Sequence, residues 1–309
     1  MRLERAVPVA IFVLFLASLP CVAQDAPPVA EEAAEGEAIV LRFNYEEGES
    51  LTYETTVDGV GSVHVMGQAQ AIEMAGSMLV TMLVEEIDED GNYVIATDVD
   101  IAELTVTMSG SPVPPPSQDM SIRTTMSPRG EVLSIELVQK VDQPNSETPW
   151  NAEMAKVLTG GFDLNRMLAG QKIAAFPEEA VRPGDEWEGN APEIEVRGET
   201  APLEITTRYD GDIELDGRQC ARLDSETSMQ AGALGELASA LSMEGFTTTQ
   251  TRSWFDYEDG RTLATMEKTQ VSMQVSVPAE MTGAEQAAGV FLEMFVDTES
   301  KLLPSGEEE

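Results

Sequence analysis

The sequence is poor in the residues from which most catalytic and metal sites are built. Its single histidine, His64, lies in the strand-like run 61–65. One histidine excludes His-rich zinc sites and HExxH helices, and we expect His64 to be an exposed strand residue without a catalytic role. No GxSxG elbow or Walker sequence occurs, and the GxGxxG match that begins at Gly59 and Gly61 fails at His64.

We therefore predict no catalytic, cofactor-binding or metal-ligating residues and no enzyme activity. A hydrolase that uses a pair of carboxylates stays open as an alternative, because distance in space defines such a pair and the chain is rich in acids. Cys220 follows the Asp216-Gly217 turn signal. It is expected to be a small buried or half-buried strand residue and not a nucleophile.

The first residues predict export. Arg2 and Arg5 precede an apolar run over residues 6–19, and a small-residue cleavage pattern follows it and ends at Ala23. The run is too short for a spanning helix, which needs about 20 apolar residues, and no later segment comes close. We expect cleavage after about Ala23 and a periplasmic or extracellular mature chain without a transmembrane segment.

Cysteine is scarce as well, since Cys21 and Cys220 are the only two. Acylation of Cys21 would tether the chain to a membrane, but it is the less favoured alternative because Ser18 and Pro20 do not fit a lipobox. After cleavage Cys220 would be the only cysteine left in the chain. The mature fold is therefore expected to have no internal disulfide, and its stability has to come from packing.

Basic residues are few: 18 Lys and Arg against 56 Asp and Glu give a formal net charge of −38. This balance excludes nucleic acid as a partner and disfavours anionic membrane surfaces. Calcium, a cationic partner and plain solubility remain as explanations, and the even spread of the acids favours solubility. The acidic segments 88–91 and 256–260 lack the ligand pattern of an EF-hand loop, so both are interpreted as hairpin turns.

Period-two alternation, the pattern of antiparallel strands with one buried face, is abundant. It is clearest over residues 203–215. The residues expected on the buried face there are Leu203, Ile205, Thr207, Tyr209, Gly211, Ile213 and Leu215. Two further sets alternate in the same way: Val271, Met273, Val275 and Val277, and Val290, Leu292, Met294 and Val296. The second set predicts a last strand over about residues 289–302.

A change of phase interrupts one of these strands. The apolar set that starts at Tyr93 shifts by one residue after Ile101. A shift of one residue inside a strand is what an extra, unpaired residue produces. We therefore predict a β-bulge near Ile101 to Glu103.

Tight turn signals and longer segments alternate along the chain. The turn signals are Asp90-Gly91, Pro128-Arg129-Gly130, Asp216-Gly217 and Asp259-Gly260. The longer segments are predicted to be loops bracketed by methionine, namely Met66 to Met74, Met108 to Met120, Met229 to Met243, and Met281 to Met294. An up-and-down meander gathers these loops at one edge. They then form either an apolar mouth for an amphiphile or a partner, or plugs that close the sheet, and the plug is favoured.

The predicted class is mainly β with minor α. The predicted divisions are a signal peptide 1–23, a disordered leader 24–38, an N-terminal β-lobe 39–142, a helical connector 143–178, a C-terminal β-lobe 179–303 and an acidic tail 304–309. Helical spacing over residues 150–171 supports the connector. The lobes are expected to be similar antiparallel meanders, either separate or joined in one curved sheet or half-barrel.

A short motif carries a resemblance to a known group. At Phe176-Pro177 and Val181-Arg182-Pro183-Gly184-Asp185-Glu186-Trp187 the chain resembles exported bacterial proteins that form a domain of unknown function. Members of that group are similar in having a signal segment, two β-rich halves joined by a "P…V..GD.W" junction, and a hairpin like Asp216 to Ala221. The resemblance covers about residues 41–303 and implies no catalytic residues. Carriers of lipoproteins and lipids are a more remote, fold-level resemblance.

These observations favour a non-enzymatic exported envelope protein that binds a ligand or partner or has a structural role. The expected partner is an unknown protein or an apolar or amphiphilic ligand, and no particular binding residue, cofactor or oligomeric state is predicted. A periplasmic carrier of a lipid or other amphiphile is one alternative. The carboxylate-dependent hydrolase is the other.

Overall fold

The computed structural model describes residues 37–65, 68–113, 120–137, 174–190, 194–196, 199–201, 204–231, 242–277 and 288–304. The expected signal segment, the helical patch over residues 150–171 and the tail from residue 305 lie outside these ranges. The strands are β1 (Ser50–Val65), β2 (Gln68–Ile87), β3 (Tyr93–Met108), β4 (Ser111–Val113), β5 (Met120–Met126), β6 (Val132–Leu137), β7 (Glu186–Asn190), β8 (Ile194–Val196), β9 (Glu199–Ala201), β10 (Glu204–Leu215), β11 (Arg218–Gln230), β12 (Glu244–Asp256), β13 (Arg261–Val277) and β14 (Ala288–Leu302).

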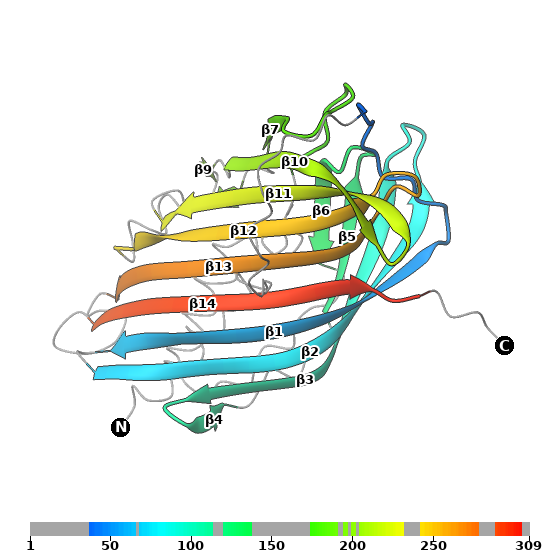
Figure 1. The fold of residues 1–309 in the computed structure, drawn as a ribbon. Coiled ribbons are helices and arrows are strands. Elements are labelled where there is room, and N and C mark those ends of the chain that lie inside the picture. The colour runs from blue at the N-terminus through cyan, green and yellow to red at the C-terminus, as the bar shows by residue number, and fades with distance from the viewer. Residues whose placement is uncertain are drawn as a thin grey trace.

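Twelve of these strands form one open antiparallel sheet (Figure 1). Its order is β6-β5-β3-β2-β1-β14-β13-β12-β11-β10-β7, with β4 beside β3, while β8 and β9 form a separate hairpin. The single curved sheet is thus the arrangement found. Strands β1 and β14 pair from Tyr53↔Leu302 to Val65↔Val290, so the first and last strands of the sheet join its two halves at the centre.

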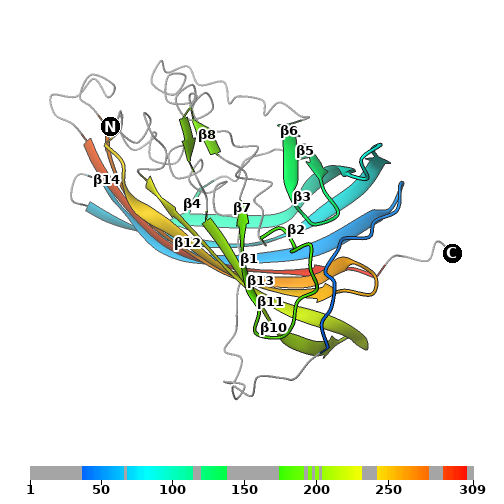
Figure 2. The same cartoon turned by 90° about the horizontal axis from the view of Figure 1, so that it is seen from above.

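The strands are long and bend together into a curved sheet (Figure 2). Strand β2 has 20 residues and β13 has 17, against about 5–6 for a typical strand. One face is buried and the other is exposed: Val57 and Val63 of β1 are buried, whereas Asp58 and His64 are exposed. We call the buried side the inner face. Within the described ranges, extensive strand contacts occur only between hydrogen-bonded neighbours, so the sheet is a single layer.

Tight turns and longer connections lie at opposite ends of the sheet, as the meander predicts. The turns β2–β3, β5–β6, β10–β11 and β12–β13 form the turn end. At the β10–β11 turn, Asp216 (φ 51°) and Gly217 (φ 80°) both adopt the left-handed backbone that a two-residue hairpin turn requires. The longer connections β3–β5, β11–β12 and β13–β14 form the loop end together with β1–β2, which has only the two residues between Val65 and Gln68.

Two of the methionine-bracketed loops are shorter than predicted. Met74 lies inside β2 and Met294 inside β14. Both side chains are buried on the inner face, Met74 with 4% and Met294 with 2% of its surface exposed. These methionines are core residues of strands, so they do not mark where a strand ends.

The predicted bulge in β3 is confirmed, and a second bulge corrects a prediction. Ser77 pairs with Glu103 and Met78 with Ile101, so Ala102 is the extra residue. In β10 the register also shifts, at Asp210. This shift turns Ile213 away from the inner face, where it had been expected, and leaves it 37% exposed.

Residues 37–45 cross the turn end and tie distant strands together. Phe43 N donates to Pro128 O at 2.8 Å, and Asn44 N donates to Gly260 O at 3.0 Å. The segment therefore links the β5–β6 turn to the β12–β13 turn. Its first residues also pair with a later part of the chain, through the bridge between Ile39 and Val181.

Residues 174–185 make a second link across the turn end. Phe176 N donates to Arg129 O in the β5–β6 turn, and Gly184 N donates to Tyr209 O in β10, both at 2.7 Å. The Gly-Asp pair of the "GD.W" junction is itself a turn, because Asp185 Oδ2 accepts from Arg182 N at 2.8 Å. The motif thus starts β7 and anchors it to β10.

Candidate functional site

The inner face changes in character from the turn end to the loop end, and three zones follow one another. The aromatic cap consists of Phe43, Tyr45, Tyr93, Phe176, Tyr209 and Phe255. The hydroxyl belt consists of Thr55, Thr207, Ser225, Thr249, Thr251, Ser253, Thr269, Thr298 and Ser300 with one carboxylate, Glu267. The methionine patch consists of Val57, Val63, Ile72, Met74, Met78, Met229, Ala231, Met243, Val271, Met273, Leu292, Met294 and Val296.

The aromatic cap is a closed core. The ring of Phe43 stacks on Phe176 at 5.2 Å between centroids and meets Phe255 edge to face at 5.3 Å. Phe176 and Phe255 also meet, at 4.8 Å. Phe43 belongs to segment 37–45 and Phe176 to segment 174–185, the two segments that cross the turn end. These segments of the chain itself therefore fill this end of the inner face.

All five tyrosines lie in or beside this cap. Burial, the largest cause in each case, raises the pKa of every one of them: Tyr45, Tyr53, Tyr93, Tyr209 and Tyr257. Three of their hydroxyls donate hydrogen bonds: Tyr53 to Thr262 O and Tyr93 to Phe43 O, each at 3.0 Å, and Tyr209 to Asp212 Oδ1. The cap therefore has a structural role.

The methionine patch has a different composition, with no ring and no charged side chain. Its members come from β1, β2, β11, β13 and β14 and from the β11–β12 connection. The register places them side by side, since Gly61 pairs with Met294 on one side and with Ile72 on the other. Methionine is unbranched and polarizable, so such a surface can adapt to ligands of different shape.

The hydroxyl belt crosses the sheet between these two zones. Glu267 of β13 pairs with Thr298 of β14 on one side and with Thr251 of β12 on the other. The row continues through Ser225 of β11 to Thr207 of β10. Paired residues on one face have Cβ atoms about 5 Å apart, so the belt is a continuous polar stripe across five strands.

Several belt hydroxyls bond one another. Thr207 and Ser225 lie 2.8 Å apart, Thr249 and Thr269 2.9 Å, and Thr55 and Ser300 2.9 Å, measured between their side-chain oxygens. A buried hydroxyl that finds such a partner avoids most of the cost of leaving water. These pairs stabilise the sheet and leave little hydrogen-bonding capacity for a ligand.

Two belt hydroxyls differ from the rest. Ser253 is 0% exposed and Thr298 is 3% exposed, and the side-chain oxygen of each is buried without a hydrogen-bond partner. A buried polar group left this way costs about 1–3 kcal/mol. Both are close to Glu267 in the register, Thr298 directly opposite and Ser253 two residues along β12 from Thr251.

Glu267 is the acidic member of the belt and is only 2% exposed. A carboxylate taken out of water requires hydrogen-bond donors or a cation around it. The belt surrounds it with hydroxyl groups. The zone therefore brings a buried carboxylate together with two hydroxyl oxygens that have no hydrogen-bond partner.

The residues singled out in the sequence do not assemble into a site. His64 is exposed on the outer face, with Nε2 3.3 Å from Ser62 Oγ. Cys220 is buried as expected, and burial raises the pKa of its thiol to about 11, which opposes thiolate chemistry.

The acidic turns are held by their own hydrogen bonds. Asp88 Oδ1 accepts from Asp90 N at 2.9 Å and from Asn92 N at 2.8 Å, and the side-chain hydrogen bond from Asn92 is the largest cause that lowers the pKa of Asp88. Asp256 Oδ1 accepts from two backbone amides of its own turn in the same way. In the ranges that the structure covers, no group of three His, Cys, Asp or Glu residues is arranged to hold a metal ion.

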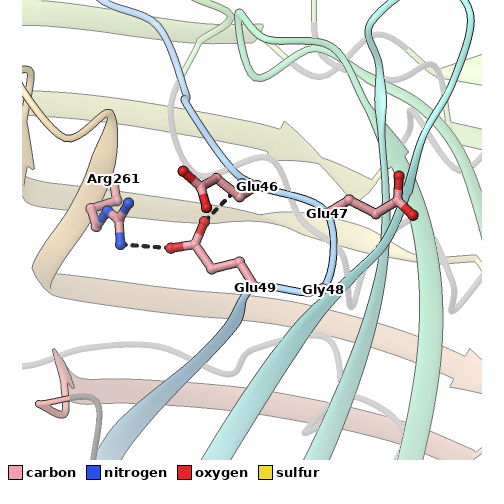
Figure 3. Close-up of a pocket in the computed structure, with 5 residues that line it drawn as sticks. All are labelled: Glu46, Glu47, Gly48, Glu49 and Arg261. Atoms are coloured by element: carbon pink, nitrogen blue, oxygen red, sulfur yellow. Dashed lines mark hydrogen bonds and ion pairs between the residues drawn. The ribbon is translucent and has the colours of Figure 1, made fainter.

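A surface pocket of about 420 Å³ lies at the turn before β1 (Figure 3). It is lined by Glu46, Glu47, Gly48, Glu49 and Arg261. Glu49 fills its own bonding capacity, because Oε1 lies 2.6 Å from Arg261 Nη1 and Oε2 accepts from Glu46 N at 3.0 Å. The pocket is therefore the outside of a turn that Glu49 holds through Arg261 and the backbone of Glu46.

The belt was missed in the sequence although a signal for it existed. The alternation that identified Val271 and Met273 continues backwards through Thr269 and Glu267 on the same face. In β14 the set that ends at Val296 continues forwards through Thr298 and Ser300. Polar residues in phase with an apolar strand face were the available sign.

No helix of the described part of the chain is long and apolar enough to cross a membrane.

Comparisons with known proteins place the chain in no family. No family model and no curated protein matches it. Similar solved structures include one on lipid–protein interactions in lipovitellin, with 8% identity, a TM-score of 0.37, and coverage of 86% of this chain and 27% of that chain. DynF from the dynemicin biosynthesis pathway of Micromonospora chersina has 8% identity and a TM-score of 0.19 over 91% and 95% of the two chains. A DUF1329 family protein from Desulfovibrio piger has 9% identity and a TM-score of 0.18 over 79% and 85%. At these scores the likenesses carry no argument about function.

Proposed function

We propose that this protein is a non-catalytic, exported binding protein that holds an amphiphile against the inner face of its sheet. The observation that carries the proposal is the methionine patch, an apolar cluster whose side chains are at most 8% exposed, on a sheet whose described strands form a single layer. Ligand pockets are lined mainly by apolar side chains, and methionine makes such a lining adaptable. The patch lies beside a polar stripe, and an amphiphile combines the same two characters.

The dimensions of the patch fit a long apolar chain. Along β14 it extends from Val290 to Val296, and along β1 from Val57 to Val63. At about 3.3 Å per residue each of these stretches measures roughly 20 Å. A single alkyl chain laid along the strands can therefore stay in contact with apolar side chains over its whole length.

A carboxylate-dependent hydrolase has less support. Asp256 and Glu267 are the buried acids among the described residues. Asp256 is engaged by Arg218 Nη1 at 3.0 Å and by the backbone of its own turn. No second buried carboxyl group accompanies Glu267 on the inner face within the described ranges, whereas glycosidase chemistry needs two that flank the substrate.

Co-purification tests the proposal most directly. The chain, expressed with its leader and purified from the periplasm without detergent, is expected to carry an amphiphile that native mass spectrometry detects and organic extraction releases. The apolar probe N-phenyl-1-naphthylamine should bind the extracted protein with a rise in fluorescence. Absence of both the co-purified amphiphile and the probe signal would overturn the proposal.

A matched pair of variants assigns the binding to the inner face. Met294→Gln places an amide of similar length in the patch and should weaken probe binding about tenfold, because burial of an amide without a partner costs at least about 1 kcal/mol. Glu293→Gln, on the exposed side of the same strand, should leave probe binding unchanged. Equal effects of the two variants would place the probe elsewhere.

A further inference from the structure

We propose that the hydroxyl belt holds the head group of the bound amphiphile and that this head group is an uncharged sugar. The inference rests on the proposed function and names the ligand class. It is carried by two side chains of the belt, Ser253 of β12 and Thr298 of β14. They are 0% and 3% exposed, and their oxygens have no hydrogen-bond partner. A ligand on the inner face can supply the partner that both hydroxyls lack.

The chemistry of the two groups matches a head that itself carries hydroxyls. A hydroxyl group both donates and accepts hydrogen bonds, and so does each hydroxyl of a sugar. Either side can therefore rotate into the role that the other requires. A hydroxyl buried without a partner is costly. The gain on binding is therefore larger here than at Thr207 and Ser225, whose oxygens already lie 2.8 Å apart.

The spacing of the two hydroxyls sets the size of the head. In the register Ser253 pairs with Thr265 of β13, and Thr298 pairs with Glu267 two residues further along the same strand. Two strand spacings across the sheet and two residues along it put Ser253 and Thr298 roughly 12 Å apart. Two hydrogen bonds of about 2.8 Å each leave about 6 Å for the head itself. A hexose ring with hydroxyls on opposite edges spans this gap, whereas the two adjacent hydroxyls of an acylglycerol do not.

The position of the belt fixes the direction of the tail. Towards the turn end, the aromatic cap is filled by Phe43 and Phe176 from the crossing segments. Towards the loop end, the methionine patch presents aliphatic and thioether side chains along the strands. A head group held by Ser253 and Thr298 therefore places its tail over the patch.

The surroundings favour an uncharged head. A charged group is costly to bury unless a counter-charge accompanies it. Within the described ranges the belt includes no Lys or Arg that could pair with a carboxylate or phosphate head. A formal net charge of −38 also repels such heads at long range. Glu267, the one carboxylate of the belt, is already engaged and offers no free counter-charge to an ammonium head.

Probes of equal tail length test the head group. Decyl glucoside, monodecanoylglycerol, decanoate and decylamine, each below its aggregation concentration, compete with N-phenyl-1-naphthylamine for the extracted protein in about 0.3 M NaCl, where long-range charge effects are screened. Decyl glucoside is expected to bind about tenfold more tightly than decanoate or decylamine, and about fivefold more tightly than monodecanoylglycerol, whose head reaches only one of the two hydroxyls. Methyl glucoside, which has the same head without the tail, should not compete.

Thr298→Val removes one hydroxyl and keeps the shape of the side chain. It should weaken decyl glucoside binding about fivefold and change decanoate binding by less than about twofold, because one neutral hydrogen bond to the sugar is lost. Ser253→Ala should act in the same way and tests the site independently if Thr298→Val does not fold. The double variant should lose the preference for the glucoside over monodecanoylglycerol. Thr56→Val makes the matched change on the exposed side of β1 and should alter no probe.

The outcomes separate the two proposals. If N-phenyl-1-naphthylamine binds and Met294→Gln weakens it, but the four heads compete equally or the glucoside preference survives in the double variant, the amphiphile-binding function stands and the sugar assignment is wrong. A preference for decylamine, decanoate or monodecanoylglycerol also overturns the sugar head. Competition by methyl glucoside would contradict a site that needs both head and tail. If no probe binds, both proposals fail.

Discussion

Thr298 and Thr55 are both buried threonines of the inner face, and they differ in one respect. The hydroxyl of Thr55 lies 2.9 Å from Ser300 Oγ, whereas the hydroxyl of Thr298 has no partner. Hydroxyl groups in these two situations contribute to stability with opposite sign. The pair therefore gives a direct test of whether the belt is built for stability or for a ligand.

Thr298→Val is expected to raise the free energy of unfolding by about 1 kcal/mol, because a methyl group of the same shape replaces a buried oxygen without a partner. Thr55→Val should lower it by about 1 kcal/mol, because it leaves Ser300 without its partner. Urea unfolding followed by circular dichroism measures both. A loss of stability in Thr298→Val equal to that in Thr55→Val would show that Thr298 is hydrogen-bonded in solution.

Strands and turns were predictable because they depend on local rules. Period-two alternation, the Asp-Gly turn pairs and the shift of phase after Ile101 each involve residues close in sequence. The bulge at Asp210 could not be found this way, because Gly211 and Ile213 fit the apolar set whether or not the register shifts. The crossing segment 37–45 has no periodicity, and its hydrogen bonds reach turns far away in the sequence.

The candidate site was harder to predict than the strands. The sequence drew attention to methionines as loop markers, yet Met74 and Met294 lie within strands. The belt consists of ordinary threonines and serines, and only the pairing of five strands brings them into one row with Glu267. Such a row depends on register between strands, and a single sequence gives no direct evidence of register.

At the scale of elements, the central pair β1–β14 contains a close backbone contact that can be tested. A Cβ atom on Gly61 would overlap the carbonyl oxygen of Glu293 and lie 2.7 Å from Met294 Cγ. Gly289, also in β14, has open space around its Cβ position. Only glycine fits the first position, whereas the second tolerates a side chain.

Gly61→Ala is expected to lower the free energy of unfolding by about 2 kcal/mol, because the two central strands have to separate. Gly289→Ala should change it by less than about 0.5 kcal/mol. Thermal and urea unfolding of the two variants side by side provide the measurement. Equal stability of both would mean that β1 and β14 are less closely paired than the register implies.

At the scale of the molecule, alkaline pH is expected to unfold the protein cooperatively. All five tyrosines have a raised pKa because of burial, and the pKa of Cys220 is raised to about 11. The folded protein therefore keeps protons that the unfolded chain releases near pH 9 for cysteine and about pH 10 for tyrosine. Stability is complete below these values and is lost as the pH rises above them.

Absorbance at about 295 nm, which reports tyrosinate, and circular dichroism should accordingly change together in one steep step above pH ~10. Tyr53 and Tyr93, whose hydroxyls donate to backbone carbonyls, lose those bonds on ionisation. A smooth titration near pH ~10 with the sheet signal intact would contradict the packing of the aromatic cap.

The pairing of β1 with β14 also sets the order of folding. The centre of the sheet stays incomplete until the last of its strands is present, so contacts between residues far apart in the chain dominate and folding is slow. Before that step, β1 and β13 each present an unpaired edge that can recruit strands from other chains. A nascent or truncated chain that lacks the 15 residues of β14 thus has two aggregation-prone half-sheets. Strand β14 joins them into one sheet by pairing with both β1 and β13.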